Sequence, residues 1–303
     1  MVTKLAELVE MVKGAETQSV AVAAGQDPDT IGAIARAVKE GVVNAILVGD
    51  EVKIKAVCKD QNIDASIFKI VHEENPAAAA RKAVSLVKDG EAGMLMKGLV
   101  KTPDYMRAIL NKEAGMLPKG GLLTHVTLCE IASYPKLLIA TDAAILPLPD
   151  MDQKAKMLGY TFKVAHALGI EQPKAALISA TETISSKIPS SMDAAVLTGM
   201  SQRKQISGGL VDGPLALDVA LSPKKCEIKG VGGPVAGQAD IVVFPNIEAA
   251  NVFYKSVSLL AGGTTAAVVM GTLAPVILTS RADDEEAKYY SIVMAAALAA
   301  DTK

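Results

Sequence analysis

The sequence predicts an α/β protein built from βαβ units, and three observations lead to that fold class. Apolar runs of about four to seven residues alternate with amphipathic stretches of about ten to fifteen, the pattern of parallel strands joined by helices. Half of the 303 residues are hydrophobic but only 3% are aromatic, so Ala, Val, Ile, Leu and Met must build the cores. The length suits two domains of about 150 residues each.

The first part of the chain is expected to alternate strands with helices. Residues 1–14 follow the pattern of an amphipathic helix, and glycines close several of the elements after it. Because ligands bind beyond the carboxyl ends of parallel strands, the turns after these strands are where a site is expected. The predicted strands are 19–25, 44–48, 68–71 and 93–96, and the predicted helices are 31–40, a stretch ending at 59, and 77–88.

The turn after the fourth strand, residues 97–107, is rich in cations. Gly98 permits a tight exit from the strand, and Thr102 can cap the helix that follows. Lys97, Lys101 and Arg107 can converge on the free N–H groups of that helix start, an arrangement that holds a phosphate well. An ordinary helix start beside solvated lysines explains the same residues equally well.

The pattern loosens between residues 115 and 121, and the chain is expected to leave its first domain in the strand pair that follows. The later predicted strands are 123–131, 136–140, 174–178, one near 209–211, 241–244 and 274–278. The later predicted helices are 150–168, a stretch ending at 200, a stretch ending at 260, and 288–300.

A glycine-rich loop covers residues 229–240, and its glycines, including Gly233 and Gly237, indicate backbone that lies close to a ligand. The loop does not match the dinucleotide fingerprint, because the last glycine of that pattern is missing and no clear strand precedes it. In the helix that follows, Asn246, Glu248 and Asn251 are most simply caps, and Lys255 either reaches a cleft or covers the surface.

Residues 279–286 place a hydroxyl, a guanidinium and several acids between a predicted strand and a predicted helix. The simplest interpretation is that Ser280 caps the helix and Asp283 answers it three residues later, a variant of the capping box. Arg281 does not fit that interpretation, because a cation at the start of a helix is unfavourable without an anion to bind. The same stretch therefore also suits an anion site.

Composition and motifs argue against several other classes of protein. A net charge of −2, few aromatics and no basic block argue against nucleic-acid binding. No apolar run approaches the length of a membrane span, and the amino terminus lacks the continuous apolar centre of a signal peptide. Three scattered cysteines, Cys58, Cys129 and Cys226, fit a reducing cytoplasm and do not suggest a metal cluster.

Motifs of common catalytic sites are also missing from the sequence. It has no zinc signature, no phosphate loop and no nucleophile elbow. The three histidines are far apart, and His125, in a predicted strand beside Thr124 and Thr127, is a weak candidate for a pocket. The sequence thus predicts phosphate-binding turns and a Ser-Arg-acid cluster, with no metal site.

Five stretches run in one order along most of residues 90–300: residues 96–112, VDGPLALD at 211–218, PVAGQAD at 234–240, NVFYKS at 251–256 and LTSRAD at 278–283. Together they resemble the phosphate acetyl/butyryltransferase family, although each is weak alone. The resemblance implies two α/β domains related in fold to the isocitrate and isopropylmalate dehydrogenases, with the active site in the cleft between them. It implies a first domain of residues 1–128 completed by 275–303, and a second domain of residues 129–274.

The resemblance also implies the reaction. Short-chain acyl-CoA, with butyryl-CoA first, and inorganic phosphate would give acyl phosphate and CoA reversibly, by direct attack in a ternary complex. Coenzyme A and phosphate are substrates in this scheme, and no cofactor is implied. A cytoplasmic homodimer is the expected form.

By the same resemblance, Ser280 lies near the thioester and the CoA sulfur, and Arg281 holds phosphate or the oxyanion. Arg107 matches another arginine of the family. An aspartate that acetyltransferases place seven residues after the serine, as proposed base for the CoA thiol, is Ala287 here, which leaves Asp283 as the candidate. The substrate-binding candidates are Lys97, Thr102, Arg107, Gly233, Gly237, Asn251 and Lys255.

Three alternatives remain open. Acetyl-CoA is the alternative substrate, although Ala287 and Leu259, which replaces a second residue of the acetyltransferases, favour the butyryl branch. A metal- and nicotinamide-dependent dehydrogenase would need a carboxylate cluster that Asp212 and Asp218 alone do not supply. A non-catalytic acyl-CoA-binding domain of the same fold is the third.

Overall fold

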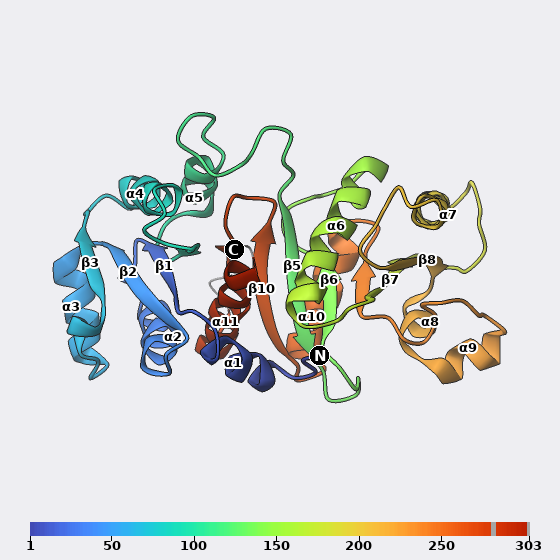
Figure 1. Ribbon diagram of the computed structural model, residues 1–303, viewed down its shortest axis with the longest axis horizontal. Coiled ribbons are helices and arrows are strands. Elements are labelled where there is room, and N and C mark those ends of the chain that lie inside the picture. The colour runs from blue at the N-terminus through green and yellow to red at the C-terminus, as the bar shows by residue number, and fades with distance from the viewer. Residues whose placement is uncertain (280–282, 302–303) are drawn as a thin grey trace. The chain divides into compact units, whose positions relative to one another are not determined.

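The computed structural model describes residues 1–279 and 283–301, which fold into alternating strands and helices (Figure 1). The chain divides into two compact units. The terminal unit comprises Ala6–Leu123 and Ala266–Lys303, and the central unit comprises Met1–Leu5 and Thr124–Thr265. The predicted α/β class is confirmed, whereas the domain boundaries predicted at 128/129 and 274/275 remain a prediction.

The terminal unit has a mainly parallel sheet. Its described strands are β1 (Gln18–Ala23), β2 (Val43–Gly49), β3 (Lys69–His72), β4 (Met94–Lys97), β10 (Thr264–Met270) and β11 (Val276–Ile277). They pair in the order β3–β2–β1–β4–β11–β10, parallel except for β10 and β11. Since the chain passes from β3 to the far side of β1 to form β4, the strand order reverses between β1 and β4. Sheets of this kind bind ligands beyond the strands at that point.

Helices cover this sheet closely because their packing faces are built from small side chains. Residues 295–299 of α11 and most of the β1 strand are buried, and α11 packs against α2, β1, β4 and β11. A helix that is apolar on nearly every side belongs in a core. The described helices of the unit are α1 (Leu5–Lys13), α2 (Pro28–Lys39), α3 (Glu51–Asp60), a 3₁₀ turn (Ala65–Ile67), α4 (Pro76–Lys88), α5 (Thr102–Ile109) and α11 (Glu285–Asp301).

The central unit has a sheet with one antiparallel edge strand. Its strands are β5 (Thr124–Glu130), β6 (Leu138–Thr141), β7 (Lys174–Ile178), β8 (Leu210–Leu215) and β9 (Ile241–Val243), in the order β5–β6–β9–β7–β8. Only β5 runs opposite to its neighbour among these described strands, so its amino end lies beside the carboxyl end of β6. Its helices are α6 (Met151–Ala167), α7 (Pro189–Gln202), α8 (Leu217–Leu221), α9 (Pro223–Lys229) and α10 (Ile247–Leu259).

Two details of the central unit differ from expectation. Strand β8 continues through Asp212-Gly213-Pro214 to Leu215, beyond the strand predicted near residues 209–211. Proline is tolerated there because β8 pairs only with β7 among the described strands and so needs no N–H on its outer side. The short helices α8 and α9 were not predicted, since five and seven residues are too few to show a helical period.

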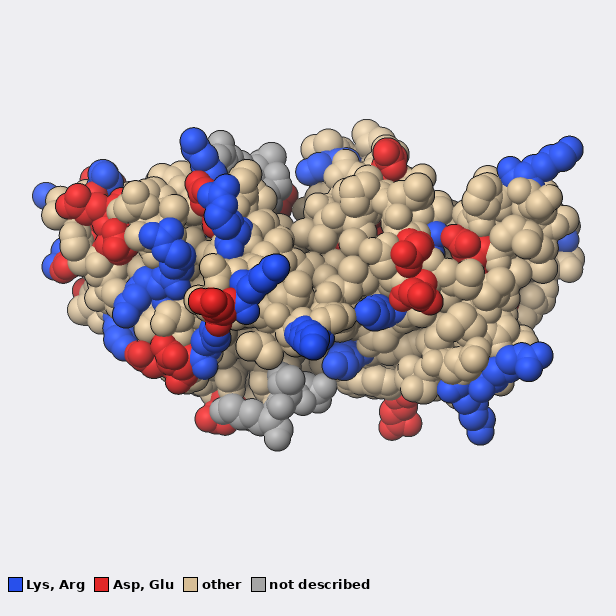
Figure 2. Space-filling model, turned by 90° about the horizontal axis from the view of Figure 1, so that it is seen from above, with Lys and Arg blue, Asp and Glu red and all other residues tan. Residues whose placement is uncertain are grey.

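The surface and the helices agree with the composition. On the face drawn in Figure 2, positive and negative side chains lie interspersed, as the net charge of −2 suggests. None of the helices within residues 1–279 and 283–301 combines the length and the apolar character needed to cross a bilayer.

Candidate functional site

In the terminal unit, the turns after β1 and β4 are locked together beyond the two strand ends. The N–H of Gly98 donates to Ala23 O at 2.9 Å, and the N–H of Leu99 donates to Ala24 O at 2.7 Å. A Cβ on Gly98 would lie 2.4 Å from Ala24 O, so the position requires glycine. Ala24 itself is buried with a φ of 56°, a strained conformation of the kind that clusters at ligand sites.

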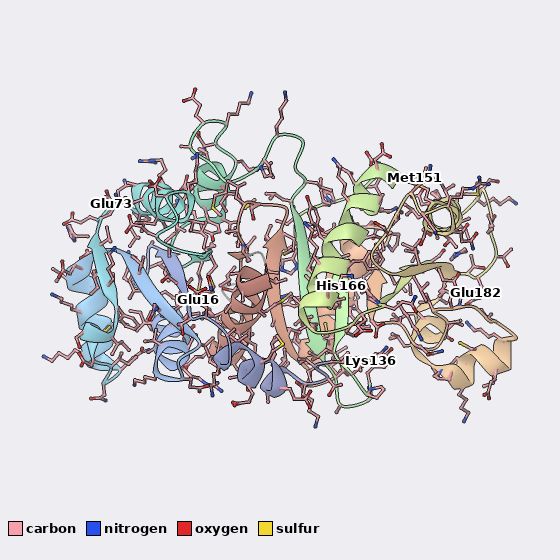
Figure 3. All side chains as sticks on the ribbon, in the orientation of Figure 1. Glu16, Glu73, Lys136, Met151, His166 and Glu182 are labelled. Atoms are coloured by element: carbon pink, nitrogen blue, oxygen red, sulfur yellow. The ribbon has the colours of Figure 1, made fainter. Side chains whose placement is uncertain are left out.

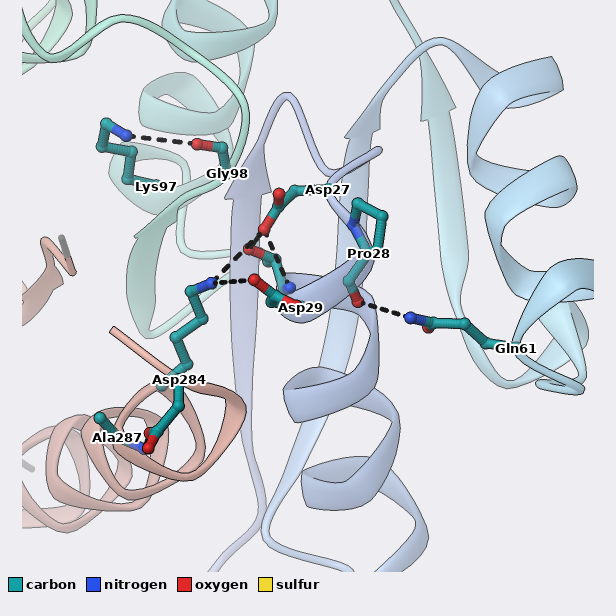
Figure 4. Close-up of polar contacts among 10 residues, drawn as sticks. Asp27, Pro28, Asp29, Gln61, Lys97, Gly98, Asp284 and Ala287 are labelled. Atoms are coloured by element: carbon teal, nitrogen blue, oxygen red, sulfur yellow. Dashed lines mark hydrogen bonds and ion pairs between the residues drawn. The ribbon is translucent and has the colours of Figure 1, made fainter. Parts of the chain in front are cut away.

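Lys97 ends β4 at this place, and its side chain is buried. The residue is only 6% exposed, and its Nζ donates to Gly98 O at 3.4 Å, the contact drawn in Figure 4. Lys97 ends a parallel strand next to the point where the strand order reverses, which is where sheets of this kind bind ligands. The charge of a lysine at this place suits an anionic ligand.

Helix α5 begins just after this turn without a side-chain cap. Lys101 occupies the cap position, and no side-chain hydrogen bond closes the first turn, whereas Asp27, Asp50 and Asn75 cap α2, α3 and α4. The predicted cap at Thr102 is wrong, because Thr102 is the first helical residue. The N–H groups of the first turn of α5 thus have no side chain to accept from them.

Arg107 lies further along α5. Its Nη1 donates to Asp104 Oδ1 at 2.7 Å, and its side chain is 76% exposed. Both residues line a hollow of about 130 Å³ between α4 and α5, together with Arg81, Asn111 and several alanines. The structure therefore gives Arg107 a carboxylate partner on its own helix, and its predicted contact with substrate stays a prediction.

The start of α11 is fixed by a buried lysine. The Nζ of Lys288, whose side chain is 4% exposed, pairs with Asp29 at 3.2 Å and with Asp27 at 3.7 Å (Figure 4). Asp284 caps the helix, since its Oδ1 accepts from the N–H of Ala287 at 2.8 Å. Asp284 thus performs the capping role considered for Asp283, which lies half-buried just before it. Ser280 and Arg281 lie outside the described residues.

In the central unit, two glycines of the glycine-rich loop, Gly233 and Gly237, are required for different structural reasons. Gly233 has a φ of +140°, and a Cβ there would lie 2.3 Å from Asp212 Oδ2. Gly237 has a φ of +75° and packs against the backbone of Pro223. Burial raises the pKa of the Asp212 carboxyl, which also accepts from the N–H of Gly213. Close packing accounts for both glycines, and their contact with a ligand stays a prediction.

Helix α10 directs several polar side chains to the strand ends of the central unit. Asn246 caps the helix, which confirms one of the three predicted candidates, whereas Asn251 lies one turn inside the helix and is not a cap. Its Nδ2 donates instead to Ala143 O at 3.1 Å. The Nζ of Lys255 lies 4.9 Å from the centre of the Tyr254 ring, a cation–π contact.

The Tyr254 ring meets His125 edge to face, with the ring centres 6.3 Å apart. The structure therefore brings His125, Tyr254, Lys255 and Asn251 together from two elements far apart in the sequence. The other histidine of this unit, His166, lies on the last turn of α6 and pairs with Ile170 O at 3.0 Å (Figure 3).

Asp142 is a residue of this region that the sequence did not single out. It is 2% exposed, and its carboxylate accepts from the Thr124 hydroxyl and from the N–H groups of His125, Ala144 and Ile145, at 2.8 to 3.0 Å. The available signal was its place directly after strand β6. The four hydrogen bonds fix the loop that carries Ala143, the partner of Asn251.

Neither a metal cluster nor an activated cysteine is visible in the described residues. Within residues 1–279 and 283–301, no three His, Cys, Asp or Glu side chains lie close enough to hold a metal ion. The three cysteines are buried free thiols, and burial raises the pKa of each, that of Cys129 to about 12. Groups of this kind are poor nucleophiles.

Comparison with known proteins gives a consistent answer. A family model described as phosphate acetyl/butaryl transferase matches residues 4–81 and 75–296. A phosphate butyryltransferase of Clostridium acetobutylicum is 46% identical over 299 residues, 99% of this chain and 99% of that relative. A phosphate acetyltransferase of Thermotoga maritima is 41% identical over 295 residues, 97% and 99% of the two chains. The crystal structure of a branched-chain phosphotransacylase from Enterococcus faecalis is similar with a TM-score of 0.82 and 32% identity, covering 93% and 99%.

Proposed function

The chain belongs to the phosphate acetyl/butyryl transferase family, and we propose that it transfers a short acyl group, butyryl first, between coenzyme A and inorganic phosphate. The observation that carries this proposal is the 46% identity to a phosphate butyryltransferase along nearly the whole of both chains. Such a match, over 99% of this chain and 99% of the relative, supports the same reaction class.

The reaction needs positioning and charge stabilisation rather than a cofactor. A phosphate oxygen attacks the carbonyl carbon of the thioester, the C–S bond breaks, and the sulfur gains the proton that hydrogen phosphate loses. Negative charge develops on the carbonyl oxygen and on the sulfur, so fixed donors that face these atoms contribute most to the rate. Holding both substrates in one complex removes the entropic cost of their encounter.

Some of the residues proposed for these tasks rest on the structure of the terminal unit, and the others rest on the family resemblance. Lys97 and the uncapped start of α5, at Thr102, are suited to hold the phosphate dianion. Ser280 and Arg281 are assigned to the thioester and to the developing charge from the family resemblance. Gly233, Gly237, Asn251, Lys255 and Arg107 are assigned to substrate binding on the same ground.

Acetyl-CoA is the second candidate substrate, because a phosphate acetyltransferase is 41% identical over nearly the whole chain. The butyryl preference is supported by the higher identity to the Clostridium enzyme, and by Ala287 and Leu259 at positions where acetyltransferases carry polar residues. A homodimer in the cytoplasm completes the proposal, and the three buried free thiols are consistent with a reducing compartment.

The test is to mix the purified protein with butyryl-CoA, propionyl-CoA or acetyl-CoA and to follow CoA release with and without phosphate. We expect release that requires phosphate, with the largest kcat/KM for butyryl-CoA. A larger kcat/KM for acetyl-CoA would replace the butyryl assignment. Binding of acyl-CoA without release from any of the three would favour the non-catalytic alternative.

A further inference from the structure

A buried lysine joins the first turn of α11 to the turn that follows β1 in the terminal unit. The side chain of Lys288 is 4% exposed, and its Nζ lies 3.2 Å from Asp29 Oδ2 and 3.7 Å from Asp27 Oδ2 (Figure 4). A cation in the first turn of a helix is unfavourable by itself, and burial adds to that cost. The two carboxylates therefore stabilise the ammonium at this place.

The two acids are fixed at the start of α2. Asp27 caps the helix, since its Oδ2 accepts from the N–H of Thr30 at 3.0 Å and also from the Thr30 hydroxyl. Asp29 follows in the first turn of α2, and its side chain is 61% exposed. Negative charge at a helix start is favourable, so both carboxylates stay where they are whether or not a cation faces them. Lys288 is the cation that faces both.

The same turn lies beside the proposed phosphate site. Ala23 ends β1 in register with Lys97, which ends β4. The N–H of Leu99 donates to Ala24 O at 2.7 Å, so the turns after the two strands are in direct contact. Asp27 follows Ala24 by three residues, and three extended residues span at most about 11 Å. The acids therefore stand close to the strand ends at which phosphate is proposed to bind.

Carboxylates at this distance affect the binding of a phosphate dianion. The Debye length is about 8 Å at physiological ionic strength, and partly buried charges are screened less than exposed ones. Two carboxylates without a cation would therefore repel a dianion that approaches the strand ends. Because the ammonium of Lys288 cancels one of their two charges, it lowers this repulsion without being part of the phosphate site.

We propose that Lys288 is a positioning residue for the phosphate site, an inference that rests on the proposed function. Its ammonium holds Asp27 and Asp29 beside the start of α11 and cancels one of their charges, which allows a phosphate dianion to bind beyond β1 and β4. Lys288 does not touch the phosphate, since its ammonium faces the two carboxylates. It acts through these acids on the affinity for phosphate.

The test is Lys288→Met, which removes the ammonium and keeps a long unbranched side chain. We expect KM for phosphate to rise about five- to tenfold, the effect of one charge at this distance in a partly screened site. The kcat at saturating phosphate should stay within about twofold of the wild type. Adding Asp29→Asn to this variant restores the balance of charge and should return KM for phosphate to within about twofold of the wild type. A merely structural lysine would lower kcat instead, and the second substitution would not restore it.

Lys13→Met is the matched control, because it removes the same charge from the same unit at the other end of α2. Lys13 lies 3.6 Å from Glu40, the residue that ends α2, and a helix of 12 residues is about 18 Å long. Its KM for phosphate should equal that of the wild type.

Three outcomes would overturn the proposal: an unchanged KM for phosphate in Lys288→Met, a loss of kcat at unchanged KM, or a KM that stays high after Asp29→Asn is added. Asp29→Asn alone changes an exposed side chain and should lower KM for phosphate about two- to threefold. An unchanged or raised KM in that variant contradicts the proposal even if Lys288→Met does not fold, which circular dichroism checks. The wild-type rates with and without phosphate decide the proposed function independently of these variants.

Discussion

Arg281 stands in the sequence four residues ahead of α11, and the family resemblance assigns it to an anion. If that anion is phosphate or the oxyanion of the transition state, Arg281→Ala should lower kcat by at least about a hundredfold, as loss of one charge-stabilising donor does. The measurement is the initial rate of phosphate-dependent CoA release from butyryl-CoA.

Arg203→Ala is the matched control for this prediction, because Arg203 is an exposed arginine at the carboxyl end of α7. We expect it to retain the wild-type rate. Near-normal turnover in Arg281→Ala would mean that the arginine has no part in stabilising the reaction.

Single residues show how far a sequence predicts a site. Lys97 was predicted as a phosphate-binding residue from its place after a strand. The structure adds that Lys97 is buried and that its neighbour Gly98 has no room for a Cβ. His125 meets Tyr254, which lies far along the chain, and Asp142 accepts from Thr124 and His125 of the neighbouring strand β5. No local spacing reveals these partners. Asn246, Glu248 and Asn251 were all cap candidates by residue type, and the structure shows that Asn246 caps the helix.

At the scale of elements, Glu40 joins three helices of the terminal unit. Its carboxylate accepts from the Tyr289 hydroxyl of α11 at 2.6 Å and from Arg36 of α2 at 3.0 Å, and lies 3.6 Å from Lys13 of α1. The hydrogen bond from Tyr289, followed by the hydrogen bond and the charge of Arg36, lowers the pKa of Glu40 below its ordinary value. The ionised carboxylate is therefore more favourable in the folded protein than in the unfolded chain.

Because the folded pKa of Glu40 is depressed, its contribution to stability is present above the ordinary glutamate pKa of about 4.3 and is lost as the pH falls through the folded value. We expect Glu40→Gln to be less stable than the wild type at pH 7, with the difference shrinking toward pH 3. Urea unfolding at several pH values measures it.

Glu10→Gln is the control for Glu40, since Glu10 pairs with the same Lys13 but its side chain is 74% exposed. Exposed pairs contribute little, so its unfolding curve should stay close to that of the wild type at every pH. A stability gap for Glu40→Gln that is the same at pH 3 and pH 7 would contradict the ionic explanation.

Most elements were predictable because the hydrophobic period is strong in long helices and buried strands. Strand β7 was predicted with its observed bounds, and α6 within one residue at each end. The misses have local causes: α8 and α9 are too short for a period, and Pro214 lies inside an edge strand where proline is tolerated. The conformation of these segments depends on their contacts with distant parts of the chain and not on local sequence preference.

At the scale of the whole molecule, alternating strands and helices were enough to predict the α/β class. Strand order was beyond the sequence, since β11 pairs with β4 nearly two hundred residues earlier and no short-range pattern records that pairing. The sequence also does not show which side chains strand pairing brings close together. The binding candidates predicted from it therefore lie mainly within single turns.

The three cysteines of the molecule bear on how the acyl group is transferred. Cys58, Cys129 and Cys226 are all buried, and burial raises the pKa of each, so none offers a thiolate to accept an acyl group. Direct transfer in a ternary complex needs no such acceptor. We therefore predict that the protein does not exchange labelled CoA into butyryl-CoA when phosphate is absent.

Adding phosphate or butyryl phosphate should start that exchange, because acyl phosphate then forms and reacts with labelled CoA. Initial rates measured at several fixed concentrations of the second substrate should give intersecting, not parallel, double-reciprocal lines. Exchange without any phosphate would instead require a covalent acyl-enzyme, since the labelled CoA could only replace the original CoA after the acyl group had moved to the protein. The nucleophile would then have to be sought among the hydroxyl and carboxylate side chains, because the three buried thiols are unsuited to that role.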